Sequence, residues 1–599
     1  MLGGYMGKLL FVDLSKGDIK EEVPEERLYQ DFMGGYGLGA RVLYSRQPGG
    51  VDPLGPESII GFVTGPLTGM RGMVMAPRFT VVGKSPLTGG WGDANSGGYF
   101  GPYLKFAGYD AVFFRGVSPK PVYLFVDNGQ AELRDAGHLW GKDSRETDEG
   151  LKSELGGNVA VACVGPAGER LSLISSIMHD IGSAAARSGL GAVMGSKRLK
   201  AVAARGTMEV PIPDKEKVTR ASKEFLGQYM GDYYERFKKW GTCGDNANAA
   251  LNGDSPVKNW AGVGVVDFPN AKAIGGDAMI AIQERKHGCL RCPIRCKGVM
   301  KAGSAREFTY EAGSHKPEYE TSAAFGMLLL NDNLESIVRA NDICNRYGLD
   351  TISAGATIAF AVECYENGII SKEDTGGIEL GWGKSQAVVA MTEQMARREG
   401  FGAVLADGVK RAAERIGKGA ERYAIHSGGQ ELAMHDPRLM SIFATAYECD
   451  SAPGRHTSGA MDAMYSSVMR IMDTSGMCML QWISAPQVDM AKIISAALGQ
   501  EVSMQDLMKI GERISHIRQA FTAREGIDPQ SRKMSSGRPV GNPPLQAGPT
   551  ANVTVDAEGM RVKYFEGMGW DLKTGKPSRE RLMALGLDDV AQDLWPASS

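Results

Sequence analysis

The chain of 599 residues lacks any long hydrophobic run. A transmembrane helix needs about 20 consecutive apolar residues, and no stretch of this kind occurs. The opening segment MLGGYMGKLLFVDLSKG also lacks a charged region followed by a long apolar run, so we expect no signal peptide. The sequence therefore predicts a protein without a membrane span and with a cytoplasmic location.

An excess of charge of one sign is also missing. Lysine and arginine number 67 against 70 aspartates and glutamates, which gives a formal net charge of −3. This balance leaves no basic surface of the kind that nucleic-acid binding requires. The nine cysteines are scattered singly apart from one cluster, which argues against a disulfide framework and favours a reducing compartment.

Glycine, by contrast, is abundant, with 79 of 599 residues against an expected share of about 7%. No low-complexity tract accounts for this excess. Many positions therefore need a close backbone approach or a positive φ angle. Such a composition suits a chain that is wrapped around a large cofactor.

The pattern along the chain predicts an α+β fold. Residues 7–210 read as short strands broken by glycine turns, and KLLFVDLSKGDIKEEV reads as a hairpin. Beyond a proline-containing linker at 207–218, apolar residues recur at helical spacing. We expect a β-rich N-terminal domain at 1–210 that forms a base for a cofactor, followed by two mostly α-helical domains at 211–417 and 418–599.

One glycine-rich stretch, FMGGYGLGARVLY, resembles a phosphate-binding turn. Its glycines Gly34, Gly35, Gly37 and Gly39 are expected to precede a short helix. The match to a dinucleotide-binding fingerprint is weak, since the G-x-G-x-x-G spacing fails. Two further small-residue segments carry Arg78 and Arg187, and they can either hold phosphates or a polar heterocycle or serve as structural turns.

The segment HGCLRCPIRCKG places three thiols within eight residues at C-x2-C-x3-C spacing. Thiolate loops of this kind bind iron–sulfur clusters or zinc. The positive charge of the loop and the lack of a second C-x2-C pair favour a cluster over a structural zinc site. A [4Fe–4S] cluster needs a fourth thiolate, and the best candidate lies in MDTSGMCML. The predicted ligands are Cys289, Cys292, Cys296 and Cys478.

Carboxylates and histidines follow the cysteine loop. Glu318 and Glu320 of the segment PEYE are two residues apart, so in an extended segment they would face the same side. Paired carboxylates near a redox centre suit general acid–base work, although glutamates in exposed loops are common. His315 is a further candidate proton carrier. His435 and His456 are also candidates, but a lone histidine is more often a packed or hydrogen-bonded side chain.

Two short patterns echo each other, NRYGLD from Asn345 to Asp350 and DTSGMC from Asp473 to Cys478. Each contains a glycine–apolar step that ends in a potential ligand or hydrogen-bonding group. An echo of this kind in two helical regions suggests pseudo-symmetric contacts to a two-part cofactor.

Taken in order, these segments resemble the tungsten-containing aldehyde:ferredoxin oxidoreductase family over nearly the full length of the chain. The resemblance rests on RFTVVGKSPLTGGWGDANSGGYFGPYLKFAGYD, ARSGLGAVMGSKRLKA, C-x2-C-x3-C, PEYE, NRYGLD and DTSGMC. It implies a tungsten ion, less often molybdenum, held by two pterins whose phosphates are linked through Mg²⁺. It also implies one [4Fe–4S] cluster beside the pterin.

The resemblance also implies roles for individual residues. The four cysteines would bind the cluster, while Glu320 and His456 would stand by the metal, with Glu318 as the alternative carboxylate. Residues of the matching motifs would contact the pterins, their phosphates and Mg²⁺: Arg78, Asn95, Gly97, Ala185, Arg187, Asp350 and Asp473.

The function implied is the interconversion of aldehydes and carboxylic acids, with electrons passing through the cluster to ferredoxin or a small iron–sulfur subunit. The alternative is the catalytic subunit of an aromatic acyl-CoA reductase of the benzoyl-CoA type, which a metal-bound cysteine would favour. A remote alternative is a non-catalytic scaffold held by zinc.

Two departures from the family pattern are visible. Asn345 stands where the family usually has Asp, which keeps a hydrogen bond but loses a charge. Arg339-Ala340-Asn341-Asp342 replaces the E-x-x-H metal bridge of homodimeric members. We therefore expect an oligomer, but not a metal-bridged homodimer.

Overall fold

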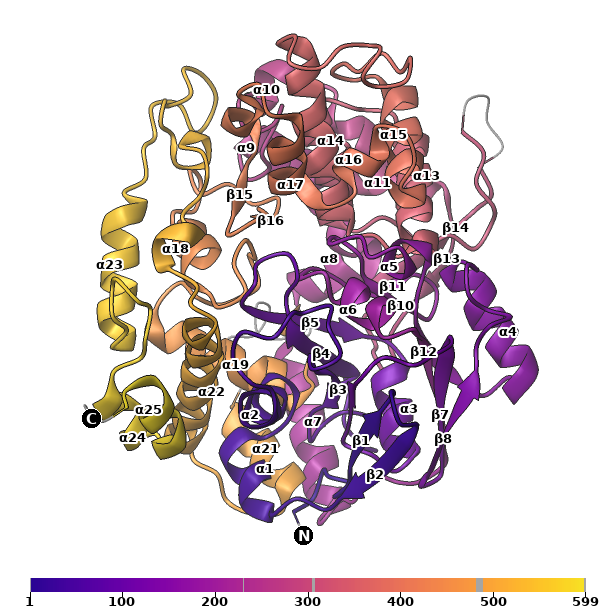
Figure 1. Ribbon diagram of the computed structural model, residues 1–599, viewed down its shortest axis with the longest axis vertical. Helices are drawn as coiled ribbons and strands as arrows, with labels where there is room; N and C mark the ends of the chain where they lie inside the picture. Colours follow the sequence, from indigo (N-terminus) through magenta and orange to yellow (C-terminus); the bar gives the residue numbers. More distant parts are fainter. Residues whose placement is uncertain (1, 230, 304–307, 481–488, 597–599) are drawn as a thin grey trace.

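The computed structural model describes residues 2–229, 231–303, 308–480 and 489–596 (Figure 1). Two six-stranded sheets lie in the N-terminal third, and helices make up most of the rest. This arrangement confirms the predicted α+β class with a β-rich N-terminal region and a mostly helical remainder.

The first sheet contains the predicted hairpin. Leu9 pairs with Glu22 and Asp13 with Asp18 in an antiparallel register, and Leu9, Leu10 and Val12 are buried. The sheet is antiparallel except where β1 runs parallel to β6. Its strands, in spatial order, are β2 (Asp18–Glu22), β1 (Leu9–Asp13), β6 (Ala111–Arg115), β3 (Ile60–Thr64), β4 (Arg78–Lys84) and β5 (Trp91–Gly97).

The second sheet shares a hydrophobic core with the first, to which Phe62 and Val81 contribute from one side and Leu124 and Val202 from the other. Its edge strand β11 contacts β5, the edge strand of the first sheet. The two sheets therefore meet at β5 and β11. The strands of the second sheet, in spatial order, are β11 (Ser183–Ala185), β10 (Ile177–His179), β9 (Ala160–Val164), β12 (Leu199–Arg205), β7 (Val122–Asp127) and β8 (Gln130–Asp135).

The expectation that all four glycines of FMGGYGLGARVLY precede a helix is wrong. Helix α2 (Gly35–Arg46) already begins at Gly35 and contains the later glycines of the segment. They are there for close packing, because a Cβ atom at Gly37 would lie 2.1 Å from the carbonyl oxygen of Phe32, and one at Gly39 would lie 2.8 Å from the Val82 side chain. Helix α2 packs against β3, β4 and two C-terminal helices.

A mostly helical body is built on one large apolar core, whose residues come mainly from the segment between Ala249 and Tyr447, with Leu87, Ala167 and Ile174 from the N-terminal region. Figure 1 shows this body above the sheets. Helix α14 lies inside this core, since residues 352–364 are all buried. Its main helices are α12 (Tyr319–Phe325), α13 (Leu334–Tyr347), α14 (Thr351–Glu366), α15 (Ser385–Arg397), α17 (Gly408–Ile416) and α18 (Ile442–Cys449).

The C-terminal helices pack back onto the first sheet. Residues such as Ile471 and Ile514 share one core with Tyr36 and Trp91 of the N-terminal region. The C-terminal helices therefore pack against the N-terminal region of the same chain. The helices are α19 (Ala463–Ser475), α21 (Met490–Leu498), α22 (Met504–Arg524), α23 (Ala557–Met568), α24 (Arg579–Ala584) and α25 (Asp588–Leu594), with α7 (Lys215–Tyr229) packed against α21.

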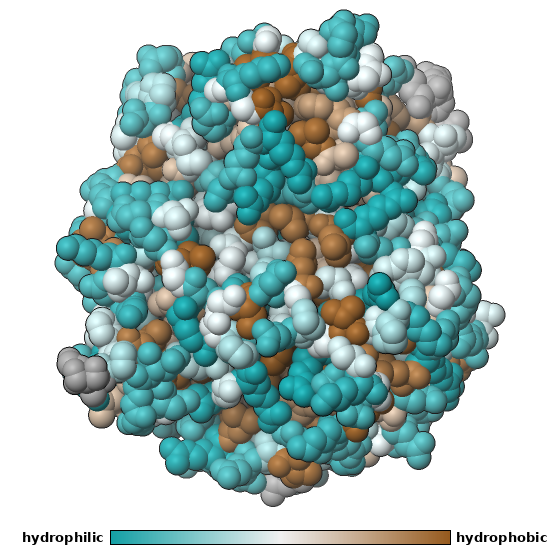
Figure 2. Space-filling model, viewed as in Figure 1, coloured by the Kyte–Doolittle hydropathy of each residue, from teal (hydrophilic) through white to brown (hydrophobic). Residues whose placement is uncertain are grey.

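The surface is mainly hydrophilic, in agreement with the absence of long hydrophobic runs from the sequence. On the face shown in Figure 2 hydrophilic residues dominate, and hydrophobic ones appear in scattered patches. Among the described residues, no helix combines the length and the apolar character that a membrane span needs.

Candidate active site

A cavity of about 560 Å³ lies where the β5 and β11 edges meet the helical parts of the chain. Its lining comes from segments far apart in sequence, from Tyr36 in α2 to Leu480 after α19. All four predicted cluster cysteines line it, as do Glu318, Glu320 and His456. Of the predicted cofactor contacts, Arg78, Asn95, Gly97, Arg187, Asp350 and Asp473 also line it.

The four thiols are brought together from two segments. Cys289, Cys292 and Cys296 lie on the turn between β13 (Gln283–His287) and β14 (Lys297–Met300), and the main-chain N–H of Cys478 donates to the carbonyl of Met75 at 3.1 Å. Burial and the neighbouring thiols raise the pKa of Cys292 to about 12. Buried thiols with raised pKa values hold no charge by themselves, whereas a bound metal deprotonates them outright.

Cations surround these thiols. Arg78 at the start of β4 donates from Nη2 to the Cys478 sulfur at 3.3 Å and from Nη1 to the Asn95 side-chain oxygen at 2.8 Å. Lys297 is bonded through Nζ to the Gly97 carbonyl at 2.8 Å. Positive groups beside sulfur ligands stabilise the anionic reduced form of a cluster.

The two small residues of the predicted set differ in position. Gly97 leaves space for the cluster loop, because a Cβ atom there would lie 3.3 Å from the Cys289 sulfur. Ala185 is fully buried in the core between the sheets, while its neighbours Ala184 and Ala186 line the cavity. A contact between Ala185 and a cofactor would therefore fall to its main chain.

Polar atoms without partners indicate that the cavity is built for a polar group. Asn95 Nδ2 and Asn345 Nδ2 are buried and make no hydrogen bond within the protein. An unpaired buried donor costs about 1–3 kcal/mol. Oxygen-rich groups such as the phosphates and rings of a pterin cofactor would satisfy these donors, so the lining fits the implied cofactor.

Arg187 occupies a strained position. Its φ angle is 75°, and the φ angle of the next residue, Ser188, is 58°. Positive φ angles of this size are rare for residues that carry a side chain. The Arg187 side chain donates to the carbonyls of Gly454, at 3.0 Å, and Glu431. Strain of this kind persists where surrounding contacts enforce it, often at functional sites.

The expectation that Glu318 and Glu320 face one side of an extended segment is wrong. Glu318 is the N-cap of α12, and Glu320 lies in its first turn. A helix turns by about 100° per residue, so the two side chains diverge within the cavity. Glu318 accepts from the Thr242 hydroxyl. Burial and the charge of Glu318 raise the pKa of Cys296, which puts Glu318 on the thiol side.

Glu320 lies instead among histidines. Its Oε1 is 3.2 Å from His456 Nδ1 and 3.5 Å from His435 Nε2, and its Oε2 accepts from the Met434 N–H at 2.9 Å. Burial raises the pKa of Glu320, whereas burial together with His435 and Arg187 lowers the pKa of His456 well below its usual value. A carboxyl group and a neutral imidazole with oppositely shifted pKa values are suited to divide acid and base roles.

The two echoing patterns have the same local structure. Gly348 ends α13 with φ 78°, and Gly476 ends α19 with φ 91°. Asp350 then caps α14 by accepting from Ile352 N–H, at the position that corresponds to Cys478. Asp473, in the last turn of α19, has its pKa raised to about 6 by burial, with Asp93 adding to the effect.

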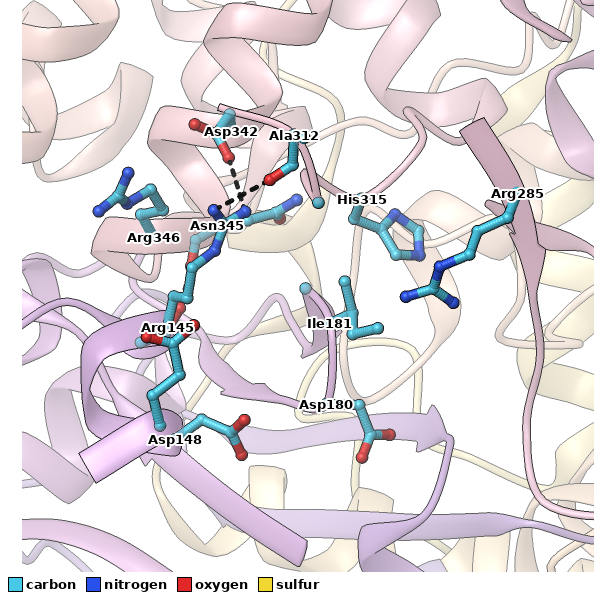
Figure 3. A pocket seen from close by; sticks show the side chains of 14 residues that line it. Arg145, Asp148, Asp180, Ile181, Arg285, Ala312, His315, Asp342, Asn345 and Arg346 are labelled. Atoms are coloured by element: carbon cyan, nitrogen blue, oxygen red, sulfur yellow. Dashed lines mark hydrogen bonds and ion pairs between the residues drawn. The ribbon is translucent and has the colours of Figure 1, made fainter. Parts of the chain in front are cut away.

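A smaller polar pocket of about 230 Å³ adjoins this cavity and shares Gly182, His315 and Asn345 with it (Figure 3). Arg145 and Asp342 lie on its wall, 3.7 Å apart. Burial and the nearby Lys297 lower the pKa of His315 to about 3. His315 is therefore neutral at physiological pH and carries no stored proton.

Sequence reasoning missed several lining residues. Arg455 ion-pairs with buried Asp93 at 3.2 Å and thereby fixes the loop that carries His456. Arg455 precedes the predicted His456 in the short motif GRH, so this motif could have pointed to it. Asp254 and Thr242 also line the cavity. Asp254 lies in a loop and Thr242 in the 3-10 helix η1 (Thr242–Asp245), and no sequence motif marks either residue.

Thiols and buried cations on one side, and a carboxylate with imidazoles on the other, define a cavity suited to a redox cofactor. Two family models match the chain, "Aldehyde ferredoxin oxidoreductase, N-terminal domain" at residues 9–206 and "Aldehyde ferredoxin oxidoreductase, domains 2 & 3" at residues 220–587. The chain belongs to the aldehyde ferredoxin oxidoreductase family, a family of oxidoreductases.

Individual relatives and a solved structure are similar to this chain over nearly its whole length. The tungsten-containing aldehyde ferredoxin oxidoreductase of Pyrococcus furiosus is 36% identical, over 98% of this chain and 99% of its own. The aliphatic sulfonate oxidoreductase, WOR-like subunit, of the same organism is 32% identical over 98% of each chain. The active site complex BamBC of benzoyl coenzyme A reductase, solved with 1,5-dienoyl-CoA, contains a chain with a TM-score of 0.81 and 25% identity, with 100% of both chains covered.

Proposed function

We propose that this protein oxidises aldehydes to carboxylic acids, or catalyses the reverse reaction, with a tungsten bis-pterin cofactor. Molybdenum is the alternative metal. An aldehyde and a water molecule become a carboxylic acid, two electrons and two protons. The observation that carries the proposal is the shared cavity, where four thiols and the Glu320–His456 pair line one volume.

Four cysteines would hold a [4Fe–4S] cluster, namely Cys289, Cys292, Cys296 and Cys478. Arg78 would lie between cluster and pterin, since it already donates to the Cys478 sulfur. Asn95, Gly97 and the main chain of Ala185 would approach Mg²⁺ and the pterin phosphates. Arg187, Asp350 and Asp473 would contact the pterins.

The bound cofactor would supply the two-electron chemistry at the carbonyl carbon. Neutral His456 would donate a hydrogen bond to the carbonyl oxygen of the aldehyde, and Glu320 would accept the proton that is released. The low pKa of His456 keeps its imidazole neutral beside Arg187. Electrons would leave singly to a ferredoxin or a small iron–sulfur subunit in the cytoplasm.

The domain boundaries are part of the same proposal. Residues 1–210 would form the pterin base, residues 211–417 would carry the cluster loop, and residues 418–599 would supply Cys478 and His456. The proposed oligomer would form without a metal bridge, because Arg339 and Asp342 occupy the bridging positions.

The aromatic acyl-CoA reductase remains the second candidate because of the likeness to the benzoyl coenzyme A reductase complex. A further cysteine at the metal would favour it. Within the described residues, Cys344, Cys364 and Cys449 lie in hydrophobic cores and do not line the cavity. This counts against the reductase.

The test is a direct comparison of substrates with the anaerobically purified protein. Benzaldehyde oxidation is followed with a viologen dye as electron acceptor, and benzoyl-CoA reduction with the reduced dye as donor. The proposal expects aldehyde-dependent dye reduction and no dienoyl-CoA product. Formation of dienoyl-CoA without aldehyde turnover would reverse the assignment.

A further inference from the structure

His435, one of the candidate histidines of the sequence, lies beside Glu320. A nitrogen or carboxylate oxygen from each of Glu320, His435 and His456 lies within 4.8 Å of those of the other two. Glu320 Oε1 therefore has an imidazole on either side, at 3.2 Å from His456 and 3.5 Å from His435. The two histidines differ in the partner of their other ring nitrogen.

The second ring nitrogen of His435 is paired with a carboxylate. Its Nδ1 is 3.0 and 3.1 Å from the two side-chain oxygens of Asp254, which follows α9 (Asn246–Asn252). The main-chain N–H of Asp436 also donates to the carbonyl of Asp254, at 2.6 Å. The two loops are thus tied together at main chain and side chain. An imidazole held between two carboxylates is oriented and favoured in its charged form.

The ring is also fixed by packing. Tyr319 of α12 stacks on it with ring centroids 4.8 Å apart, and Phe443 of α18 lies at 5.2 Å. The Tyr447 hydroxyl donates to the His435 carbonyl at 2.6 Å. With two aromatic rings packed against it and the carbonyl engaged, the ring has little freedom to turn away from Glu320.

The charges around the pair agree with this geometry. Burial would lower the pKa of His435, but the hydrogen bond that His435 donates to Asp254 and the charge of Glu320 raise it. Two further charged groups act on the pKa of Glu320: Arg187 lowers it and Asp254 raises it. His456, with its lowered pKa, adds no charge, and Tyr319 and Tyr447 stay neutral because burial raises their pKa values. Asp436 is paired with Arg438 at 2.6 Å.

We propose that His435, held as an imidazolium by Asp254, is a positioning residue that keeps Glu320 ionised and aimed at the substrate. It acts through Glu320, which takes the proton released from the aldehyde, while the two electrons leave through the cluster to the iron–sulfur acceptor. Asp254 acts in turn through His435. The inference rests on the proposed aldehyde oxidation, since it assigns Glu320 the role of base.

The sign of the expected effect follows from charge. Without the imidazolium the carboxylate of Glu320 loses a stabilising neighbour, so the pKa of Glu320 rises. A cation within 4–6 Å shifts a carboxyl pKa by roughly 1–3 units. The acidic limb of kcat/KM should therefore move to higher pH by about 1–3 units. Activity returns at high pH, where the base is ionised again.

The experiment uses the holoenzyme with His435→Gln and Asp254→Asn, the second being the more conservative change in shape. Each pH profile of benzaldehyde oxidation is compared with the parent protein. The matched control is His138→Gln, since His138 forms an exposed pair with Glu154 at 3.2 Å outside the cavity. The inference expects both cavity variants to move the acidic limb upward and the control to leave it in place. Loss by one factor at every pH, or an unmoved limb, would overturn it.

A second measurement does not depend on turnover. Infrared titration of the protein free of tungsten follows the carboxylic acid band that disappears in Glu320→Gln. The midpoint of that band should rise by a similar amount in His435→Gln and Asp254→Asn. If aldehydes are not oxidised but the midpoint moves, the proposed function fails while the coupling stands. If aldehydes are oxidised and the midpoint stays, the role of His435 is refuted.

Discussion

The two sides of the cavity differ in the groups that line them, although only Tyr319 separates Glu318 from Glu320 in the sequence. On the thiol side Glu318 accepts a hydrogen bond from Thr242 and lies near Cys296. The cations on this side are Arg78, which donates to the Cys478 sulfur, and Lys297, which donates to the Gly97 carbonyl. On the other side Glu320 lies among imidazoles and main-chain donors. The start of α12 at Tyr319 separates them, since a helix rotates by about 100° per residue and so points the two carboxylates in different directions.

The difference shows how one cavity can handle electrons and protons separately. Soft sulfur ligands and fixed cations suit a centre that gains and loses electrons. Carboxylates and imidazoles with shifted pKa values suit proton transfer. The predictions below break one side while leaving the other intact.

The largest effect should come from Cys478→Ser. A cluster that loses one of its four thiolates is lost or converted, and electrons then have no route out. Aldehyde turnover should disappear, with iron content and the reduced-cluster EPR signal falling together. The control is Cys364→Ala, which lies in the helical core and should retain iron and activity. Full turnover in Cys478→Ser would remove this residue from the electron path.

Glu320→Gln should come next. Loss of a positioned general base lowers the rate by about 10²–10⁴-fold. Tungsten and iron contents should remain those of the parent, because the change lies on the proton side. Glu318→Gln is the matched variant and should lower kcat by less than tenfold. Equal losses in the two variants would contradict the division of the cavity.

Asp473 gives a pH-dependent prediction for the cofactor-free protein. Its pKa is raised from 3.8 to about 6 in the folded state, so the folded chain binds a proton more tightly than the unfolded chain. Stability from this group is present below pH 4 and is lost as pH rises through 6, at a cost of about 3 kcal/mol. Asp473→Asn should remove that loss, as measured by urea unfolding at pH 4 and pH 7. A variant that is less stable than the parent at pH 7 would refute the direction.

The smallest effect should come from Gly97→Ala. The added methyl group would lie 3.3 Å from the Cys289 sulfur and 3.4 Å from Pro77, so the cluster loop must give way by a few tenths of an ångström. We expect a few-fold drop in iron content and an unchanged pH profile. Gly157→Ala is the control, because no heavy atom lies within 4 Å of its added Cβ. A shifted pH profile in Gly97→Ala would mean that the two sides are coupled.

Much of the fold follows from local pattern. The hairpin at Leu9–Glu22 has alternating residues around a Lys-Gly turn, and the change from strand to helix near residue 215 agrees with the observed α7. The matched glycines Gly348 and Gly476 end two helices in the left-handed conformation, which explains the echo between the two patterns.

Other features depend on partners distant in sequence. The glycines at 37 and 39 are needed because Phe32 and Val82 lie against them, which no local pattern reveals. Asp254 and His435 are 181 residues apart, and neither stands in a motif that points to the other. Glu318 and Glu320 both line the cavity, but the extended segment that the sequence predicts for them is instead the start of helix α12. Short helices that begin at a buried loop have weak sequence signals.

Elemental analysis of the anaerobically purified protein tests the central claim most directly. The account predicts one tungsten, or molybdenum, and about four iron atoms per chain, with negligible zinc. Stoichiometric zinc without tungsten, molybdenum or iron would contradict it and would leave the four cysteines as a structural metal site.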